Sequence, residues 1–346
     1  MYVGLCFIII FIMHINSTLP KKILAWYYNS KRKLPWRVGK KSPKKLYYRL
    51  LSEFMLQQTQ VKTVIPYFNK FTNKFKTIKD LSKSKEREIL KMWEGLGYYR
   101  RARNLLACSN ILVNNYKSRL PRSIIEIKKL PGVGDYTANA LLGLVYNEPR
   151  IALDGNVKRV FSRNLNIEEK KINFDKLIKK NKKKLFITKR NDDFVEALME
   201  FGALICKPKD PNCLTCCLNK TCKYFKSNKK IKNIKNKMIK NKNYDIFCYI
   251  NKKQQIALTK RNQISFLKNF NLPEIKESKS SLKNKNWIFL KNYKNSISNL
   301  KLNINLYYKF SNKIPRTYSW HSLKNNREFV PSFTKKILRQ VSTLFL

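Results

Sequence analysis

The first two thirds of the chain carry the hydrophobic periodicity of short amphipathic helices. From residue 19 to about residue 225, apolar residues recur at spacings of three and four, as one buried helix face requires. The spacing is clear at Leu46, Leu50 and Phe54. Glycine and proline residues interrupt the pattern between such segments, as at Pro131-Gly132. The pattern predicts an all-α N-terminal domain over residues 19–225.

The last third of the chain has a different texture. A charged, asparagine-rich run over residues 226–242 has little apolar surface to bury and indicates a linker. Short segments rich in Ile, Tyr and Phe follow, which is typical of strands; they lie at Tyr244–Ile250, Gln255–Leu258, Trp287–Leu290 and Ile304–Phe310. A final helix is expected from Pro331 to about Leu344. Residues 243–346 are therefore expected to form a smaller α+β domain.

The charge balance points to a polyanionic partner. The chain has 74 Lys and Arg against 21 Asp and Glu, a formal net charge of +53. Such an excess favours nucleic acid ahead of a membrane surface. Lys, Asn and Ile are abundant throughout, however, as a compositional drift toward AT-rich codons would also produce. Charge alone therefore does not establish DNA binding.

The N-terminus and the scattered cysteines bear on the compartment. The opening MYVGLCFIIIFIMHI is apolar, but it lacks a basic start and a small-residue cleavage site, and it is too short to span a bilayer. Cys6, Cys108 and Cys248 stand singly, unlike the framework of a secreted disulfide-rich domain. We expect a soluble, cytoplasmic, nucleoid-associated monomer without a membrane partner.

The segment LPGVGDYTANALL, residues 130–142, predicts a tight turn between two helices. Gly132 and Gly134 allow the reversal, so that backbone N–H groups, with that of Val133 between them, are exposed at the start of the second helix. Such N–H groups and the helix dipole together bind anions such as phosphate. Asp135 is expected to cap the second helix. An ordinary helix–helix corner is the alternative interpretation.

Five cysteines fall within CKPKDPNCLTCCLNKTC, residues 206–222. Cys206, Cys213, Cys216 and Cys222 have Cys-x6-Cys-x2-Cys-x5-Cys spacing, which suits an iron–sulfur cluster or a structural zinc ion. Zinc ribbons usually pair two Cys-x2-Cys knuckles, and this segment has one, so the spacing favours iron–sulfur. On spacing alone, Cys217 could replace Cys216 as the third ligand.

Several motifs together resemble a known family. The helix-hairpin-helix turn LPGVG, the Asp in LDGNVKRV and the cysteine spacing resemble the endonuclease III superfamily of base-excision glycosylases. LSEFMLQQTQVKTVIPYF (51–68) and GLGYYRRARNL (95–105) resemble its adenine DNA glycosylase branch, the MutY type. The resemblance is dense from about residue 34 to residue 222. It implies a 4Fe-4S cluster on the four cysteines, and excision of adenine mispaired with 8-oxoguanine or guanine in double-stranded DNA.

The resemblance also implies catalytic roles. Glu53 would protonate N7 of adenine and handle the incoming water. Asp154 would stabilise C1′ of the sugar or transiently bond to it, as paired carboxylates do in glycosidases. Glu53 then needs a raised pKa while Asp154 stays ionised. Asn156 would orient Asp154 or a water. Tyr136 stands where lyase members carry an imine-forming lysine, which implies a monofunctional enzyme with Tyr136 hydrogen-bonding in the pocket.

Further positions match the family's base pocket and mispair contacts. Trp36, Arg37, Leu56 and Glu196 resemble the residues around the flipped adenine. Glu196 would accept a hydrogen bond from the exocyclic amine, and Arg37 would donate one to a ring nitrogen. Gln58 and Tyr98 match positions around the mispair, with Tyr98 as a wedge beside 8-oxoguanine.

By the same resemblance, residues 243–346 would be a Nudix-like domain that recognises 8-oxoguanine. The family's Phe-Ser-His motif has its best counterpart in Phe310-Ser311-Asn312. Asn in place of His puts strict selectivity for 8-oxoguanine in doubt. The Glu-rich signature of a hydrolytic Nudix enzyme is missing, so no nucleotide hydrolysis is expected.

Two other functions remain open at this point. One is a pyrimidine glycosylase and AP lyase of the endonuclease III type, opposed by Tyr136 and by roughly 120 additional C-terminal residues. The other is a DNA-binding protein whose catalysis has decayed, suggested by the compositional drift and the altered 310–312 loop. The retention of Glu53 and Asp154 opposes it.

Overall fold

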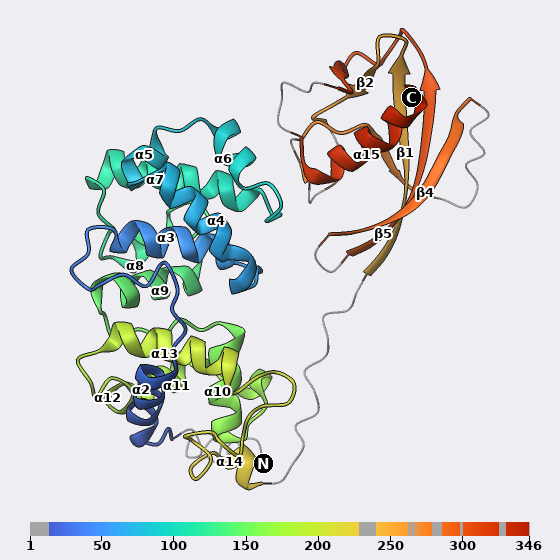
Figure 1. Ribbon diagram of the computed structural model, residues 1–346. Helices are drawn as coiled ribbons and strands as arrows, with labels where there is room; N and C mark the ends of the chain where they lie inside the picture. Colours follow the sequence, from blue (N-terminus) through green and yellow to red (C-terminus); the bar gives the residue numbers. More distant parts are fainter. Residues whose placement is uncertain are drawn as a thin grey trace, which may run out of the picture. The chain divides into compact units, whose positions relative to one another are not determined.

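The computed structural model in Figure 1 describes residues 14–227, 240–261, 264, 267–268, 270–278, 286–297, 300–324 and 330–345. The apolar start and most of the expected linker lie outside these residues. The chain forms two compact units, and only their described residues are discussed below. The helical unit combines Met1–Ser84 with Asn104–Ile234, and the sheet unit combines Lys85–Arg103 with Lys235–Leu346.

Helices dominate the chain up to residue 226, which confirms the prediction of an all-α N-terminal region. In order they are α2 (Thr18–Ser30), α3 (Lys45–Leu56), α4 (Val61–Lys74), α5 (Ile78–Ser82), α6 (Glu86–Met92), α7 (Arg100–Tyr116), α8 (Ile124–Lys128), α9 (Asp135–Tyr146), α10 (Gly155–Leu165), the 3-10 turn η1 (Glu169–Lys171), α11 (Phe174–Lys180), α12 (Lys182–Leu185), α13 (Asn191–Leu204) and α14 (Lys223–Lys226). No helix in the described part of the chain is long and apolar enough to cross a membrane.

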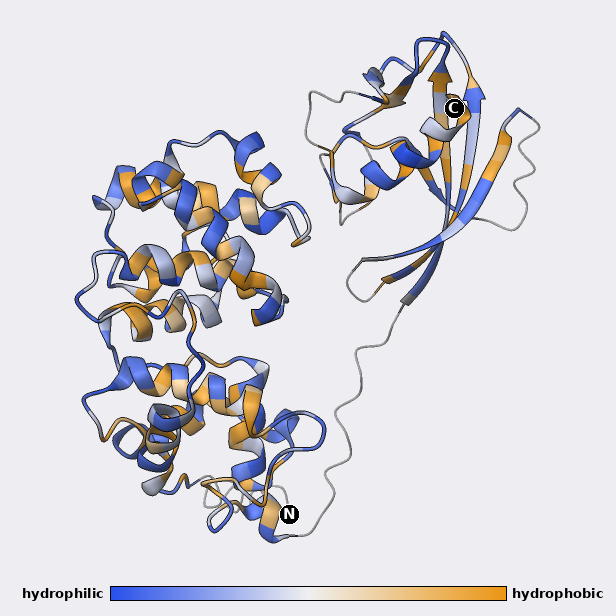
Figure 2. Cartoon of the chain, viewed as in Figure 1, coloured by the Kyte–Doolittle hydropathy of each residue, from blue (hydrophilic) through white to orange (hydrophobic). Residues whose placement is uncertain are grey.

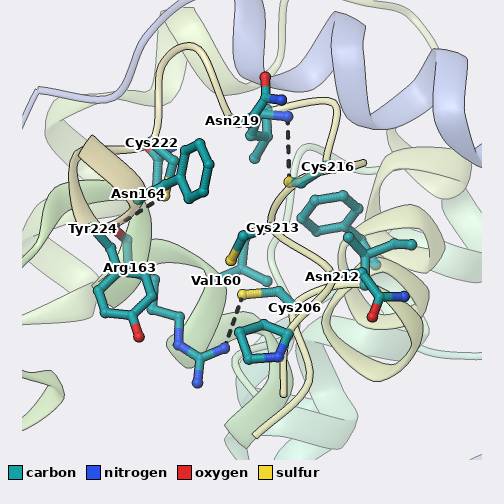
Figure 3. Close-up of a pocket in the computed structure, with 15 residues that line it drawn as sticks. Val160, Arg163, Asn164, Cys206, Asn212, Cys213, Cys216, Asn219, Cys222 and Tyr224 are labelled. Atoms are coloured by element: carbon teal, nitrogen blue, oxygen red, sulfur yellow. Dashed lines mark hydrogen bonds between the residues drawn. The ribbon is translucent and has the colours of Figure 1, made fainter. Parts of the chain in front are cut away.

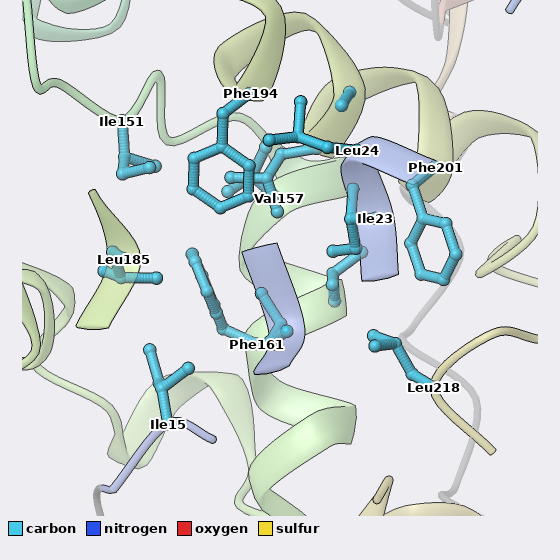
Figure 4. Packing of buried hydrophobic residues seen from close by; sticks show 14 of the residues in the cluster. Ile15, Ile23, Leu24, Ile151, Val157, Phe161, Leu185, Phe194, Phe201 and Leu218 are labelled. Carbon is cyan, nitrogen blue, oxygen red and sulfur yellow. The ribbon is translucent and has the colours of Figure 1, made fainter. Parts of the chain in front are cut away.

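Helix α13 is central to the helical unit, because it contacts α2, α9 and α10, while α3 contacts α4 and α9. Its apolar side joins a cluster that includes Ile23 of α2, Phe161 of α10 and Phe194, all fully buried (Figure 4). Burying a side chain of this size contributes about 1.5–3 kcal/mol. Figure 2 shows hydrophobic and hydrophilic stretches alternating along the helices. Helix α2 is thereby fixed to the second half of the unit.

The sheet unit contains a six-stranded mixed sheet, which confirms the predicted α+β character of the C-terminal region. The strands are β1 (Lys240–Asn251), β2 (Gln255–Leu258), β3 (Glu274–Glu277), β4 (Ile288–Ile297), β5 (Leu300–Phe310) and β6 (Ser319–Ser322). Their order is β4-β5-β1-β2-β6, with β3 also paired to β1. Strands β1 and β5 run parallel, and the other pairs are antiparallel. Helix α15 (Ser332–Ser342) follows and ends in the 3-10 turn η3 (Thr343–Phe345).

The strand boundaries correct the expectations at three places. Strand β1 begins at Lys240, inside the segment expected as linker, because Lys240 pairs with Leu300 of β5. Strand β4 extends to Ile297, well beyond the expected four residues. Strands β3 and β6 were not expected. These segments are rich in Lys, Asn, Glu and Ser, and the cross-strand partner rather than local hydrophobic alternation makes them strands.

Candidate active site

The helical unit contains a pocket of about 520 Å³. It brings together side chains from the loop after α2 and from α3, α9, α10 and α13 that are distant in sequence. All of the expected catalytic and base-pocket residues line it, namely Trp36, Arg37, Glu53, Leu56, Tyr136, Asp154, Asn156 and Glu196. Among the expected base contacts, Trp36 is buried edge-on against Phe68, with ring centroids 5.3 Å apart.

Glu53 is a buried carboxyl group in this pocket, 5% exposed. It lies in α3, where the neighbouring Phe54 and Met55 are fully buried. Burial raises the pKa of Glu53 to about 7, while a hydrogen bond with Tyr136 and the charge of Arg49 oppose that rise. Near neutral pH the group is thus divided between acid and carboxylate, as a general acid requires.

Asp154 has a different environment. It is the N-cap of α10, where its Oδ1 accepts a hydrogen bond from the Val157 N–H (2.7 Å) and its Oδ2 accepts one from Asn156 Nδ2 (2.8 Å). Burial raises the pKa of Asp154, and these two donors oppose the rise. The donors favour the ionised form, so Asp154 and Glu53 have unlike surroundings.

Tyr136 lies in the first turn of α9, and its hydroxyl is 3.3 Å from the sulfur of Met199. Burial, followed by the charges of Glu53 and Asp154, raises the pKa of the Tyr136 hydroxyl well above its ordinary value. The group therefore stays protonated and can donate a hydrogen bond to a carboxylate.

Glu196 of α13 is held by three donors. Its Oε2 accepts from the Tyr27 hydroxyl (2.6 Å), and its Oε1 accepts from Arg37 Nε (3.3 Å) and from Arg49. Burial alone would raise the pKa of Glu196, but the guanidinium groups of Arg49 and Arg37 lower it below the ordinary value. Glu196 is therefore an anion in this pocket.

One turn further along α13, Glu200 forms a second ion-pair cluster. Its carboxylate accepts from Arg32 Nη2 (2.7 Å) and Arg37 Nη2 (3.0 Å). Burial opposes ionisation, yet these arginines lower the pKa of Glu200 to about 2. Tyr27, Arg32, Arg49 and Glu200 were not predicted from the sequence. Two acidic residues four positions apart on a largely apolar helix were the available signal, since a buried charge requires a partner.

The predicted hairpin joins α8 to α9, and its two glycines have different roles. Gly132 has a φ of +78°, and a Cβ there would lie 2.8 Å from side-chain atoms of Phe54 and Asn104. Gly134 has a φ of −98° and open space around it. The Val133 N–H already donates to the Leu130 carbonyl (3.1 Å). Gly132 is thus required by the fold, whereas Gly134 leaves the backbone accessible.

The expected cap at Asp135 is wrong. Gly134 is the N-cap of α9, and Asp135 is the first residue of the helix. Its exposed carboxylate pairs instead with Lys128 of α8 (2.6 Å). This ion pair compensates the negative charge beside the hairpin.

Cys206, Cys213, Cys216 and Cys222 line one cavity, together with apolar side chains (Figure 3). Cys217 is not among its lining residues. Arg163 Nη1 lies 3.5 Å from the Cys206 sulfur, and the Leu218 N–H lies 3.4 Å from that of Cys216. Four thiols with N–H donors suit a thiolate-bound cluster in kind. In the described part of the chain, however, no three Cys, His, Asp or Glu side chains are close enough to hold a metal ion.

The residues expected around the mispair lie outside the pocket lining. Gln58 is exposed in the helical unit, with a φ of +58°. Tyr98, also at positive φ, belongs to the sheet unit, as do Phe310 and Ser311. Phe310 is 50% exposed, and the Ser311 hydroxyl donates to the Lys313 carbonyl (2.6 Å).

The chain is similar in sequence and in fold to known base-excision proteins. A family model described as HhH-GPD superfamily base excision DNA repair protein matches residues 51–185. An adenine DNA glycosylase of Buchnera aphidicola subsp. Baizongia pistaciae is 38% identical over 92% of this chain and 95% of the relative. Another, of Buchnera aphidicola subsp. Schizaphis graminum, is 35% identical over 91% of this chain and 96% of the relative. A solved thermostable thymine-DNA glycosylase is 30% identical with a TM-score of 0.54, over 61% of this chain and 96% of that one.

The family match and these relatives, together with the helical hairpin between α8 and α9, identify a helix-hairpin-helix base-excision protein. The chain belongs to the HhH-GPD superfamily of base excision DNA repair proteins, in the same family as these adenine DNA glycosylases. The resemblance found in the sequence is confirmed.

The two hairpin glycines should differ in their effect on stability. Gly132→Ala should lower the free energy of unfolding by about 1–3 kcal/mol, because alanine is strained at positive φ and its Cβ clashes. Gly134→Ala should change it by less than about 0.5 kcal/mol. Urea unfolding followed by circular dichroism measures both. Equal effects would contradict the roles assigned to the two glycines.

Glu53 should make stability depend on pH. Its pKa rises from 4.5 to about 7 on folding, so stability falls as pH rises through this window and the loss is complete above pH 7. Glu53→Gln removes this loss. The variant should therefore gain stability relative to the wild type by up to about 3 kcal/mol between pH 4.5 and pH 8. Urea unfolding across this range tests it, with the exposed Glu126→Gln as control; a constant difference would refute the burial effect.

Proposed function

We propose that the protein is a monofunctional adenine DNA glycosylase that acts in base excision repair on double-stranded DNA. The observation that carries the proposal is one pocket with Glu53, buried with a pKa of about 7, and Asp154, held by two hydrogen-bond donors. The adenine DNA glycosylases that match over nine tenths of the chain support the choice of adenine.

Breaking a purine N-glycosidic bond develops negative charge on the base and positive charge on the sugar. The protonated fraction of Glu53 donates to the departing adenine and later receives a proton from the attacking water. The buried, protonated Tyr136 hydroxyl positions Glu53. Asp154 stays available as a carboxylate because Asn156 and the Val157 N–H satisfy its oxygens, and its negative charge stabilises the cationic sugar.

The adenine must leave the helical stack to reach this pocket, which costs a few kcal/mol. Trp36 and Leu56 supply apolar contacts, while Glu196 and Arg37 supply an acceptor and donors for the edge of the base. Tyrosine at position 136 cannot form an imine with the sugar. Within the lining of this pocket, the one amine is that of the exposed Lys62.

Contacts to the DNA backbone involve the hairpin. The open space at Gly134, at the start of α9, allows a phosphate to approach the helix N-terminus. The general excess of basic residues adds sequence-independent attraction.

A 4Fe-4S cluster is proposed on Cys206, Cys213, Cys216 and Cys222. The support is their spacing, their shared cavity and the N–H donors beside two of the sulfurs. A bound cluster would cross-link this loop and so fix its shape.

Recognition of 8-oxoguanine opposite the adenine is assigned to Tyr98, Gln58 and the loop Phe310-Ser311-Asn312 of the Nudix-like region. The support is the resemblance, together with the exposure of Phe310 and Gln58. Asn312 keeps hydrogen-bonding capacity without an imidazole, so discrimination between 8-oxoguanine and guanine is expected to be weaker than a histidine would give.

A labelled duplex with adenine opposite 8-oxoguanine tests the reaction. Under single-turnover conditions we expect strand breaks only after hot alkali, because the base leaves without lyase action. Asp154→Asn should slow excision by about 100- to 1000-fold while duplex binding persists, since the charge that stabilises the sugar is lost. Asp175→Asn, an exposed change on α11, is the matched control and should keep the wild-type rate.

Other outcomes identify the alternatives. Breaks without alkali would indicate a lyase, with Lys62 as the amine to test by substitution. Binding without excision in the wild type would favour a DNA-binding protein whose catalysis has decayed. An unchanged rate in Asp154→Asn would refute the proposed mechanism.

The cluster is tested by iron and sulfide analysis of anaerobically purified protein. We expect about four irons and four sulfides per chain. Cys206→Ser should lose most of the iron, whereas Cys217→Ser should retain it, because only Cys206 of the pair lines the cavity. Equal iron loss from both variants would contradict the assigned ligand set.

A further inference from the structure

Arg49 is a buried cation inside the candidate active site that the proposed reaction does not use. It lies on α3 one helical turn before Glu53, lines the same pocket and is 7% exposed. One of its terminal nitrogens donates to Glu196 on α13. Its Nε is buried without a hydrogen-bond partner in the described part of the chain. The guanidinium is therefore only partly satisfied.

Two carboxyl groups compete for this cation. Residues four apart on a helix have neighbouring side chains, so Glu53 is within reach of Arg49. The ion pair forms with Glu196 instead. Glu196 also accepts from Tyr27 and Arg37, so it is the better stabilised anion of the two. Glu53 is left without a cationic partner among the described residues.

The pocket lining contains other charged or titratable groups besides Arg49. They are Arg32 and Arg37 from the loop after α2, Lys62 from α4, Tyr136 from α9, Asp154 from the start of α10, and Glu196 and Glu200 from α13. Arg32 and Arg37 are held by Glu200 at 2.7 and 3.0 Å. Asp154 is held by its own two donors. Arg49 is thus the buried cation nearest to Glu53 along the chain, and its choice of partner decides the charge that Glu53 experiences.

We propose that Arg49 is a positioning residue that sets the pH range over which Glu53 can donate a proton, and that Glu196 holds Arg49 away from a direct pair with Glu53. The kinetic consequence rests on the proposed glycosylase function, but the electrostatic one does not. Consistent with this, the charge of Arg49 already opposes the effect of burial on the pKa of Glu53.

The proposal requires substitutions at the two ends of the ion pair to act in opposite directions. Without the Glu196 carboxylate, Arg49 turns to Glu53 and holds it ionised. Without Arg49, Glu53 keeps its proton to higher pH. Removing both partners should bring Glu53 back toward its wild-type behaviour, the signature of a coupled pair in a double-mutant cycle.

The first experiment follows the titration of Glu53 in the full-length protein labelled with ¹³C at the glutamate carboxyl carbon, assigned by loss of one signal in Glu53→Gln. In Glu196→Gln the midpoint should fall by about one pH unit or more, and in Arg49→Met it should rise by about one unit. Lys45→Met is the matched control. It removes a cation one turn earlier on α3, one that pairs with Asp192 outside the pocket lining, and should leave the midpoint unchanged.

A folding defect in Arg49→Met does not remove the test. Glu196→Gln and the double variant Arg49→Met/Glu196→Gln differ only at position 49. Because both replace Glu196, neither contains a buried Glu196 carboxylate that lacks a cationic partner. The midpoint should be higher in the double variant. Equal titration midpoints in these two variants would overturn the proposal. So would a midpoint shift in Lys45→Met as large as the shifts expected in Arg49→Met and Glu196→Gln.

The second experiment measures single-turnover adenine excision across pH 5–9 with the duplex described above. In Arg49→Met the alkaline limb should move up by about one pH unit, about tenfold in rate at a fixed pH above the midpoint. A purely structural role would lower the rate equally at all pH values, and this outcome would refute the proposal. Failure of the wild type to excise adenine would refute the proposed function, and the carboxyl titrations would still decide the role of Arg49.

Discussion

Neutralisation of buried charge along α13 is the constraint on which the active site depends. Glu196 and Glu200 are carried into the interior by a helix whose other face packs in the main core. Each would be strongly destabilising without a cationic partner. Arg32, Arg37 and Arg49 supply the partners, and in doing so they draw the loop after α2 and helix α3 onto α13.

The same desolvation has two different results within one pocket. Where arginines compensate the desolvation, as at Glu196 and Glu200, the carboxyl groups stay ionised and form a fixed part of the pocket lining. Where no cation is assigned, as at Glu53, burial prevails and the group holds its proton near neutral pH. The reactive group is thus distinguished by the partner that it lacks rather than by any special chemistry of its own.

Sequence reasoning reached much of this arrangement. Apolar spacing predicted the helices, and Gly132-Val133-Gly134 predicted the hairpin that α8 and α9 form. Motif resemblance picked out Glu53, Tyr136, Asp154 and Glu196, which the fold brings into one pocket. Arg49 was not predicted, because an arginine among apolar residues is expected to be solvated until its partner on another helix is known. The polar strands β3 and β6 were not predicted for a similar reason, since their strand structure depends on the strands with which they pair.

The interaction between α2 and α13 has a consequence for synthesis of the chain. Tyr27 and Glu196 are 169 residues apart, and Arg49 and Glu196 are 147 apart. At ribosomal rates of about 5–20 residues per second, roughly 7–34 s separate the appearance of these partners. During that interval Arg32, Arg37 and Arg49 lack Glu196 and Glu200 as partners, and the core that α2 joins lacks the residues of α13. A nascent chain that ends before α13 therefore carries the acid Glu53 but lacks the α13 side of the pocket around it.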